Sequence, residues 1–259
     1  MAVMLERAAD VAVMVLLWAA LLLAVSAACG AIANSLPGVT PFESPRVLVG
    51  AGLLAVCFAA MAVLPLYART PRSLGRSDEV RWMLDRGRHL TVRLLRDVLG
   101  LAMISWRRLL VALVAGVAGG LVSVAIGGAL LLVPALAESV PASDARFDAV
   151  AGTAPWVPPA FFAIYAAAPE EIIYRGVLLG ALALSVETIR SRWARVVVAS
   201  GALLIVSAVF GQVHLDWSLL NAVTAGVTGA VYGIVAIATR SLWAAIIAHM
   251  LYNALIFVV

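Results

Sequence analysis

The chain alternates long apolar runs with short polar segments, and seven of the runs are long enough to cross a bilayer. A helix needs about 20 apolar residues to span a hydrocarbon core roughly 30 Å thick. The runs cover, within roughly 2–4 residues at each end, residues 11–33, 47–68, 109–133, 157–184, 196–213, 217–238 and 242–259. The pattern therefore predicts an all-α fold, a polytopic membrane bundle of about seven transmembrane helices.

The composition agrees with a bilayer as the solvent of this chain. Of the 259 residues, 64% are hydrophobic and only 12% are charged, and the mean hydropathy is +1.07. A soluble domain of this length carries far more polar surface. All 18 basic residues are arginine, a usage that hints at a GC-rich bacterial genome. We therefore expect a multi-pass protein of a bacterial inner membrane.

Loop charges predict the orientation of the chain. Ten arginines lie between residues 69 and 108, three between residues 185 and 195, and Arg240 precedes the last run. The alternate loops contain only Arg46 and Arg146, and the loop from 138 to 156 is acidic. Cytoplasmic loops carry the excess of basic residues, so we expect a cytoplasmic N-terminus and an external C-terminus. Topology thus accounts for the net charge of +4, and no nucleic-acid partner is implied.

The arginine-rich segment 77–99 has its apolar residues at helical spacing, so they can form one face. We expect an amphipathic helix on the inner leaflet, with its arginines near anionic head groups. His89 belongs to this surface rather than to a site. Elsewhere, two glycine pairs at a spacing of four predict close contacts between helix backbones: Gly116 with Gly120, and Gly229 with Gly233.

Polar groups at membrane depth are the informative residues, because a central charge costs about 2.5–3.5 kcal/mol to insert. The run 157–184 contains Glu170, Glu171 and Arg175. Glu171 and Arg175 are four residues apart and can pair on one helical face. Glu170 lies about 140° round the helix from Arg175, since a turn takes 3.6 residues. Glu170 is then a carboxyl without a cationic partner, which suits proton transfer.

The neighbours of Glu170 fit the same picture. Tyr174 follows it by four residues and could hydrogen-bond to it from the same face. Pro169 weakens the helix one turn earlier and can open local space for water or substrate.

Two further runs carry a polar residue within a pair at a spacing of four: Phe210 and His214 at the end of one run, and His249 and Asn253 in the last. Taken singly, an intramembrane histidine or asparagine is more often a hydrogen-bonding group between helices. Three runs that each carry such groups favour convergence on one site.

These residues match a known family. Glu170-Glu171-Ile-Ile-Tyr-Arg175 fits E-E-x-x-x-R, Phe210-Gly-Gln-Val-His214 fits F-x-x-x-H, and His249-Met-Leu-Tyr-Asn253 fits H-x-x-x-N. Their order and spacing resemble the CAAX-protease and bacteriocin-processing (CPBP, or Abi) family. The resemblance covers residues from about 157 to 259. It divides the chain into N-terminal membrane helices with a basic amphipathic segment (1–156, with 69–108) and a catalytic helical core (157–259).

The resemblance implies an intramembrane endopeptidase that hydrolyses a peptide bond of a membrane-associated protein or peptide. Carried onto this chain, Glu170 is the general base that activates water, with help from His214. His249 and Asn253 stabilise the oxyanion of the tetrahedral intermediate. Their chemistry agrees, because a carboxylate accepts a proton while an imidazole and an amide can donate hydrogen bonds. Glu171, Arg175, Tyr174 and Phe210 are supporting residues.

The sequence leaves the use of a metal open. Glu170, His214 and His249 would make a two-histidine, one-carboxylate zinc set. The chain has no H-E-x-x-H motif and no obvious fourth ligand. A metal-free glutamate mechanism without a cofactor is therefore favoured, with zinc as the alternative.

Two other functions are consistent with parts of the sequence. A proton-coupled transporter would also place glutamate and histidine in the membrane, but the first half of the chain lacks polar residues at depth. A non-catalytic interaction or immunity protein would need no catalytic glutamate. In the expected topology, His214 lies near the external end of its span and Glu170 about midway.

Overall fold

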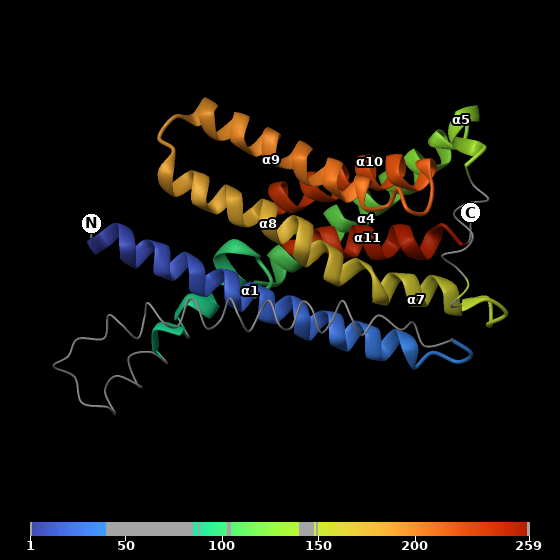
Figure 1. Cartoon of the computed structure of the whole chain (residues 1–259), viewed down its shortest axis with the longest axis horizontal. Coiled ribbons are helices and arrows are strands. Elements are labelled where there is room, and N and C mark those ends of the chain that lie inside the picture. Colours follow the sequence, from blue (N-terminus) through green and yellow to red (C-terminus); the bar gives the residue numbers. More distant parts are fainter. Residues whose placement is uncertain are drawn as a thin grey trace.

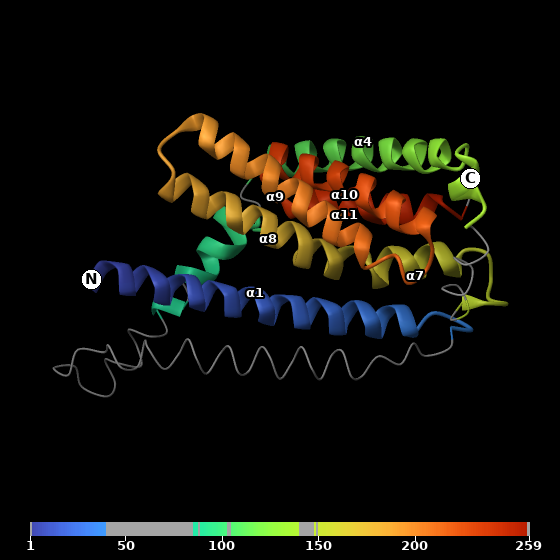
Figure 2. The ribbon, with the colours of Figure 1, turned by 45° about the horizontal axis from the view of Figure 1, so that its top comes forward.

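The computed structural model describes residues 2–39, 85–87, 89–102, 105–139, 148 and 150–257. Within these residues the fold is all helical and contains no strand, which confirms the predicted fold class. The long helices run roughly along one axis and form an elongated bundle (Figures 1 and 2). The expected span 47–68 lies outside the described residues.

Four of the described helices are long and apolar enough to cross a membrane. They are α1 (Ala2–Asn34, with its span at Asp10–Asn34), α4 (Trp106–Leu130), α9 (Arg192–Gln212) and α10 (Leu219–Thr239). The last helix, α11 (Leu242–Leu255), is apolar but shorter. Large apolar side chains on α9 are exposed, among them Val197 at 69% and Leu204 at 67%, as expected of a surface that faces lipid.

The run predicted as one span over residues 157–184 is two helices, which corrects that prediction. α7 covers Val157–Tyr165 and α8 covers Ala167–Thr188, with a break at Ala166. Pro169 accounts for the break, because it has no backbone N–H and its ring clashes with the carbonyl four residues earlier. That carbonyl belongs to Tyr165, the last residue of α7. The interruption leaves Glu170 in the first turn of α8.

Helices α4 and α11 pack closely because α4 has glycines where they meet. A Cβ added to Gly116 would lie 2.8 Å from the carbonyl oxygen of Ala244, and one added to Gly120 would lie 3.0 Å from that of Ala248. Both glycines are buried. The predicted glycine contact is therefore present, and it brings α11, which carries His249, against α4.

The described part of the basic segment, residues 85–87 and 89–102, ends in a short π-helix, η1 (Leu94–Val98). Its leucines Leu90, Leu94 and Leu99 are buried within the protein, so this apolar face packs on other helices. His89 is exposed, away from the site. Gly100 adopts a φ of +59° where the chain meets the α10–α11 turn, and the amide of Leu242 donates a hydrogen bond of 2.9 Å to the Leu99 carbonyl. The contact of this segment with anionic lipid stays a prediction.

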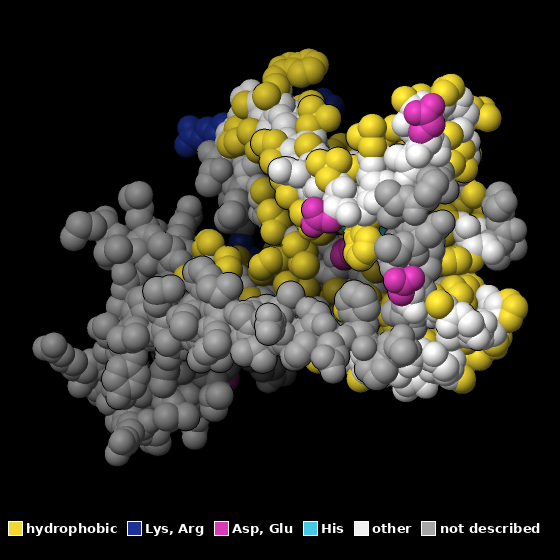
Figure 3. All heavy atoms as spheres, turned by 45° about the vertical axis from the view of Figure 1, so that its right-hand side comes forward, with side chains coloured by type: hydrophobic (Ala, Val, Ile, Leu, Met, Phe, Trp, Pro, Cys, Tyr) yellow, Lys and Arg dark blue, Asp and Glu magenta, His cyan; other side chains and the backbone are white. Residues whose placement is uncertain are grey.

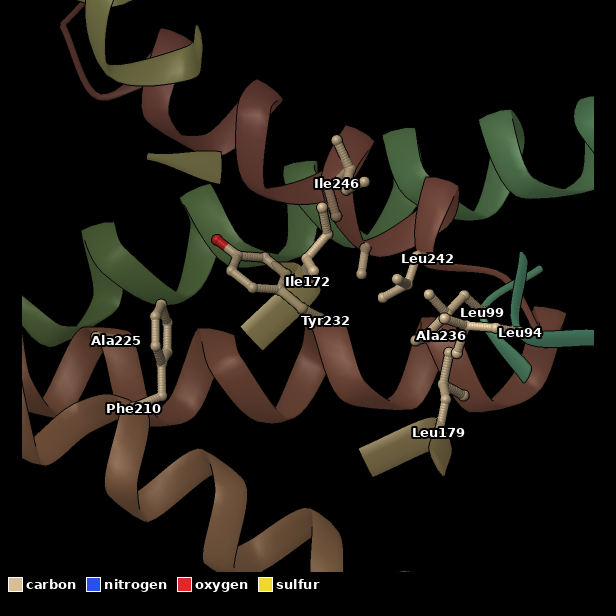
Figure 4. Close-up of a cluster of buried hydrophobic side chains, with 12 residues drawn as sticks. Leu94, Leu99, Ile172, Leu179, Phe210, Ala225, Tyr232, Ala236, Leu242 and Ile246 are labelled. Carbon is tan, nitrogen blue, oxygen red and sulfur yellow. The ribbon is translucent and has the colours of Figure 1, made fainter. Parts of the chain in front are cut away.

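The buried core runs along the bundle (Figure 4). Leu94, Leu99 and Leu242 gather at one end of it, Phe210 and Ala225 lie at the other, and Tyr232 stands between them.

The segments that were expected to be cytoplasmic lie toward one end of the molecule. The N-terminus, the start of α4, the α8–α9 loop and the α10–α11 turn lie toward one end, whereas the α9–α10 connection and the C-terminus lie toward the other (Figures 1 and 2).

Candidate active site

The residues singled out on three apolar runs line one cavity of about 230 Å³. α8 contributes Glu170, the turn after α9 contributes His214, and α11 contributes His249 and Asn253. The break before α8 and the end of α9 lie beside the middle of α11, so the three sequence motifs meet there. The catalytic roles of these four residues stay predictions, but the structure does bring their side chains to the same space.

Glu171 lies at the centre of a buried charge cluster. Its Oε1 atom is 3.1 Å from a guanidinium nitrogen of Arg175, which is the predicted pair across one helical turn. The same oxygen is 2.9 Å from Nδ1 of His249. The side chains of Glu171 and Arg175 are fully buried and that of His249 is 6% exposed. Glu171 therefore joins α8 to the imidazole of α11, a contact that helical spacing within one run could not predict.

Arg175 is held by groups from three helices. It donates a hydrogen bond of 2.7 Å from Nη2 to the carbonyl of Gly229 on α10. Its guanidinium carbon lies 4.5 Å from the ring centre of Phe210 and 5.3 Å from that of Tyr232, distances at which a cation is attracted to a ring face. A Cβ at position 229 would lie 2.9 Å from Nη2. The absent side chain of Gly229 therefore makes room for the arginine.

Hydrogen-bond partners define the tautomers of both imidazoles. Nδ1 of His249 faces the carboxylate of Glu171, and Nδ1 of His214 lies 2.7 Å from the carbonyl oxygen of Phe210. A carbonyl or an ionised carboxylate accepts but cannot donate, so each Nδ1 carries the hydrogen. Each ring then has Nε2 left for the cavity. Nε2 is a proton acceptor when the ring is neutral and a donor when it is charged.

Glu170 differs from its neighbour because it faces the cavity. Its side chain is 29% exposed, and its Oε2 lies 3.9 Å from Nε2 of His249, too far for a direct hydrogen bond. Within the described part of the chain, Oε2 has no hydrogen-bond partner. The expected bond from Tyr174 is also absent there, because Tyr174 packs against Phe210 at a ring distance of 4.8 Å and does not line the cavity.

Asn253 connects the cavity to the end of α7. Its amide nitrogen donates a hydrogen bond of 3.1 Å to the carbonyl of Phe162. An amide nitrogen carries two hydrogens, so this bond orients the group and leaves the second hydrogen for another acceptor. The side chain expected to stabilise an oxyanion is thus held in a fixed position at the cavity wall.

Aromatic rings form much of the cavity, and the sequence motifs do not include most of them. Tyr232 stacks on His249, with ring centres 5.0 Å apart and planes 18° from parallel. Phe210, which the motif does contain, contacts both imidazoles edge-on at 4.7 and 5.9 Å. The remaining aromatic lining comes from Phe161, Phe162, Tyr165, Trp217 and Tyr252. In the sequence these residues look like ordinary apolar helix positions, so no signal distinguished them.

Whether Glu170, His214 and His249 hold zinc, the alternative considered from the sequence, stays open. Among the described residues, no three His, Cys, Asp or Glu side chains lie in an arrangement that could hold a metal ion. Nε2 is the nitrogen that each histidine has left for a ligand, since Glu171 and the Phe210 carbonyl face the Nδ1 atoms, and Nε2 of His249 lies 3.9 Å from Oε2 of Glu170. Zinc ligands all lie about 2 Å from one point. The metal requirement of the protein stays a question for experiment.

Comparison with known proteins agrees with the motifs. Residues 152–255 match the family model of the Type II CAAX prenyl endopeptidase Rce1-like domain. No curated protein and no solved structure gave a significant match. The matched residues include helices α7 to α11, and with them every residue of the three motifs. The division of the chain at residue 156 stays a prediction. Residues 152–255 are thus similar to a protease domain of the CAAX-protease family, in a chain with helices long and apolar enough to cross a membrane.

Proposed function

We propose that this protein is an intramembrane endopeptidase that cleaves a peptide bond of a membrane-associated protein or peptide with water activated by Glu170. The observation that carries the proposal is the single cavity shared by Glu170, His214, His249 and Asn253. A carboxylate, two imidazoles and an amide can supply, without a metal, a base for water and hydrogen-bond donors for an oxyanion.

The spacing of Glu170 and His249 suits a shared water molecule. Two hydrogen bonds of about 2.8 Å that meet near a right angle separate their end atoms by about 4 Å. The 3.9 Å between Oε2 of Glu170 and Nε2 of His249 agrees with that value. In the proposed reaction, Glu170 takes a proton from the water while the water oxygen bonds to the carbonyl carbon.

The tetrahedral intermediate needs hydrogen-bond donors for its oxyanion. Nε2 of a protonated His249 and the second amide hydrogen of Asn253 can supply them. The C–N bond then breaks, and the amine leaves with the proton that Glu170 held. His214 supports this proton transfer through its own Nε2.

Glu170→Gln is the direct test of this proposal. We expect cleavage to fall on the order of 10²–10⁴-fold, because an amide cannot accept the proton from water. The folded protein should remain, since the ion pair of Glu170 with Nε2 of His249 is long, at 3.9 Å, and the buried Glu171–Arg175 pair is kept. The measurement compares membrane proteomes of wild-type and Glu170→Gln cells, in which uncleaved precursors should accumulate.

Glu138→Gln is the matched control, because Glu138 is exposed and does not line the cavity. It should leave the proteome as in wild type. A Glu170→Gln strain that keeps every cleavage and phenotype would instead favour the non-catalytic interaction or immunity function.

A chelator separates the proposed mechanism from a zinc enzyme. With the purified protein in detergent, we expect cleavage to persist after treatment with a zinc chelator, since Glu170 supplies the base without a metal. Loss of cleavage that added zinc restores would contradict the metal-free mechanism while leaving the protease function intact.

A further inference from the structure

The rim of the cavity lies at the arginine-poor end of the bundle. His214 and Trp217 follow the end of α9, Asn221 lies in the first turn of α10, and Ile256 follows the end of α11. Trp217 is 36% exposed, whereas Phe210 and Tyr232 on the floor are each 1% exposed. Exposure therefore rises from the floor toward these helix ends, and the cavity opens there.

The charges at the two ends differ in sign. Two groups of arginines belong to segments toward the N-terminal end: Arg107, Arg108 and Arg240 at the start of α4 and in the α10–α11 turn, and Arg190, Arg192 and Arg195 in the α8–α9 loop and the start of α9. The described residues at the cavity end carry the exposed acids Glu138, Asp148 and Asp216. Figure 3 turns the cavity end toward the viewer: magenta acidic side chains stand out on it, and the dark blue arginines lie mostly behind and to the left.

Helix lengths keep the two ends on different sides of a bilayer. α9 has 21 residues, which corresponds to about 30 Å at 1.5 Å per residue, the thickness of a hydrocarbon core. It runs from the arginine-rich loop to His214, so its two ends reach the two interfaces. Because arginine-rich loops remain in the cytoplasm, the end with the cavity rim faces the other side.

We propose that the active site takes its substrate from the non-cytoplasmic side of the membrane, as a peptide segment with an apolar side chain beside the scissile bond. This inference rests on the proposed protease function. Phe161, Phe162, Trp217 and Tyr252 supply apolar walls for such a side chain. Asn253 and His249 face the same space, so the carbonyl of the bound peptide reaches the donors from the outer side.

Cysteine labelling tests the side of the opening without any need for activity. Cys29 and Cys57 are first replaced by alanine, and single cysteines are then placed at three exposed positions. Leu132→Cys and Asp216→Cys report on the cavity end, and Trp193→Cys reports on the arginine-rich end. Leu132 and Trp193 are a matched pair, 83% and 79% exposed, and neither lines the cavity.

In intact cells, a membrane-impermeant maleimide should label positions 132 and 216 and leave position 193 unlabelled until the membrane is permeabilised. The reverse pattern, or equal labelling of both ends in sealed cells, would overturn the inference. This result is independent of catalysis, so it decides the side of the opening even if no substrate is cleaved.

A second experiment tests whether a peptide is cleaved from the side of the membrane on which the cavity opens. A short internally quenched peptide with leucine and phenylalanine at its centre is added to sealed membrane vesicles of both orientations. We expect cleavage that depends on Glu170 in right-side-out vesicles, and in inside-out vesicles only after detergent is added. Cleavage confined to inside-out vesicles would overturn this inference and keep the protease. If Glu170→Gln cleaves the peptide as well as wild type in either orientation, the proposed function fails while the labelling result stands.

Discussion

Two adjacent glutamates on α8 have different surroundings. Glu171 is fully buried and contacts both Arg175 and His249, whereas Glu170 is 29% exposed and faces the cavity. Their positions differ by about 100° round the helix. The sequence separated the two correctly, because the Glu171–Arg175 pair depends only on helical spacing.

The buried charge cluster predicts a large effect on stability at Glu171. Glu171→Gln leaves the Arg175 guanidinium buried without its carboxylate, and removal of one partner from a buried pair costs about 3–5 kcal/mol. We expect a clear drop in the free energy of unfolding in detergent. The double variant Glu171→Gln/Arg175→Met should be less destabilised than the sum of the two single variants.

Asp10 and Arg86 provide the matched control for these Glu171 and Arg175 variants. They form an ion pair of 2.6 Å whose side chains are each 26% exposed. Pairs that water still reaches contribute only about 0–1 kcal/mol, so Asp10→Asn should change stability less than Glu171→Gln. Equal effects of Asp10→Asn and Glu171→Gln would contradict the role of burial.

At the scale of elements, the glycines of α4 determine how closely α11 approaches. Gly116 lies against the carbonyl of Ala244, whereas Gly128 on the same helix has no atom within 4 Å of an added Cβ. Gly116→Ala forces the two helices apart, and overpacking of this kind costs about 1–3 kcal/mol. Because α11 carries His249 and Asn253, cleavage should fall as well.

Gly128→Ala tests the same substitution without the contact. It should be neutral or stabilising by up to about 1 kcal/mol, since alanine favours a helix over glycine. Thermal unfolding in detergent and the rate of cleavage measure both variants. A Gly116→Ala protein as stable and as active as Gly128→Ala would show that α4 does not hold α11 in place.

At the scale of the whole molecule, the N-terminal helix is part of the structure that supports the site. The indole Nε1 of Trp18 on α1 donates a hydrogen bond of 2.8 Å to the carbonyl of Ile172, the residue after Glu171. The family match begins only at residue 152, so neither motif nor family model indicated this contact. α1 lies along α7 and α8, across the break that exposes Glu170 (Figure 2).

Trp18→Phe should therefore weaken the bundle next to the site. Loss of this partly buried hydrogen bond costs about 0.5–1.5 kcal/mol, and we expect a lower unfolding temperature together with slower cleavage. Trp106→Phe is the control, because Trp106 is 71% exposed and should tolerate the change. If the two variants behave alike in both assays, α1 does not support the site.

The sequence by itself determined the all-helical fold, five of the described apolar helices, the residues of the three motifs and the Glu171–Arg175 pair. These features depend on hydrophobic runs, on helical periodicity and on the cost of burying charge, all of which act along one segment. Only the tertiary structure decided the helix break at Ala166, the bond between Glu171 and His249, the stacking of Tyr232 and the place of Gly229 beside Arg175. Each of these joins residues on different elements or arises where segments pack, and no local spacing encodes which helices become neighbours.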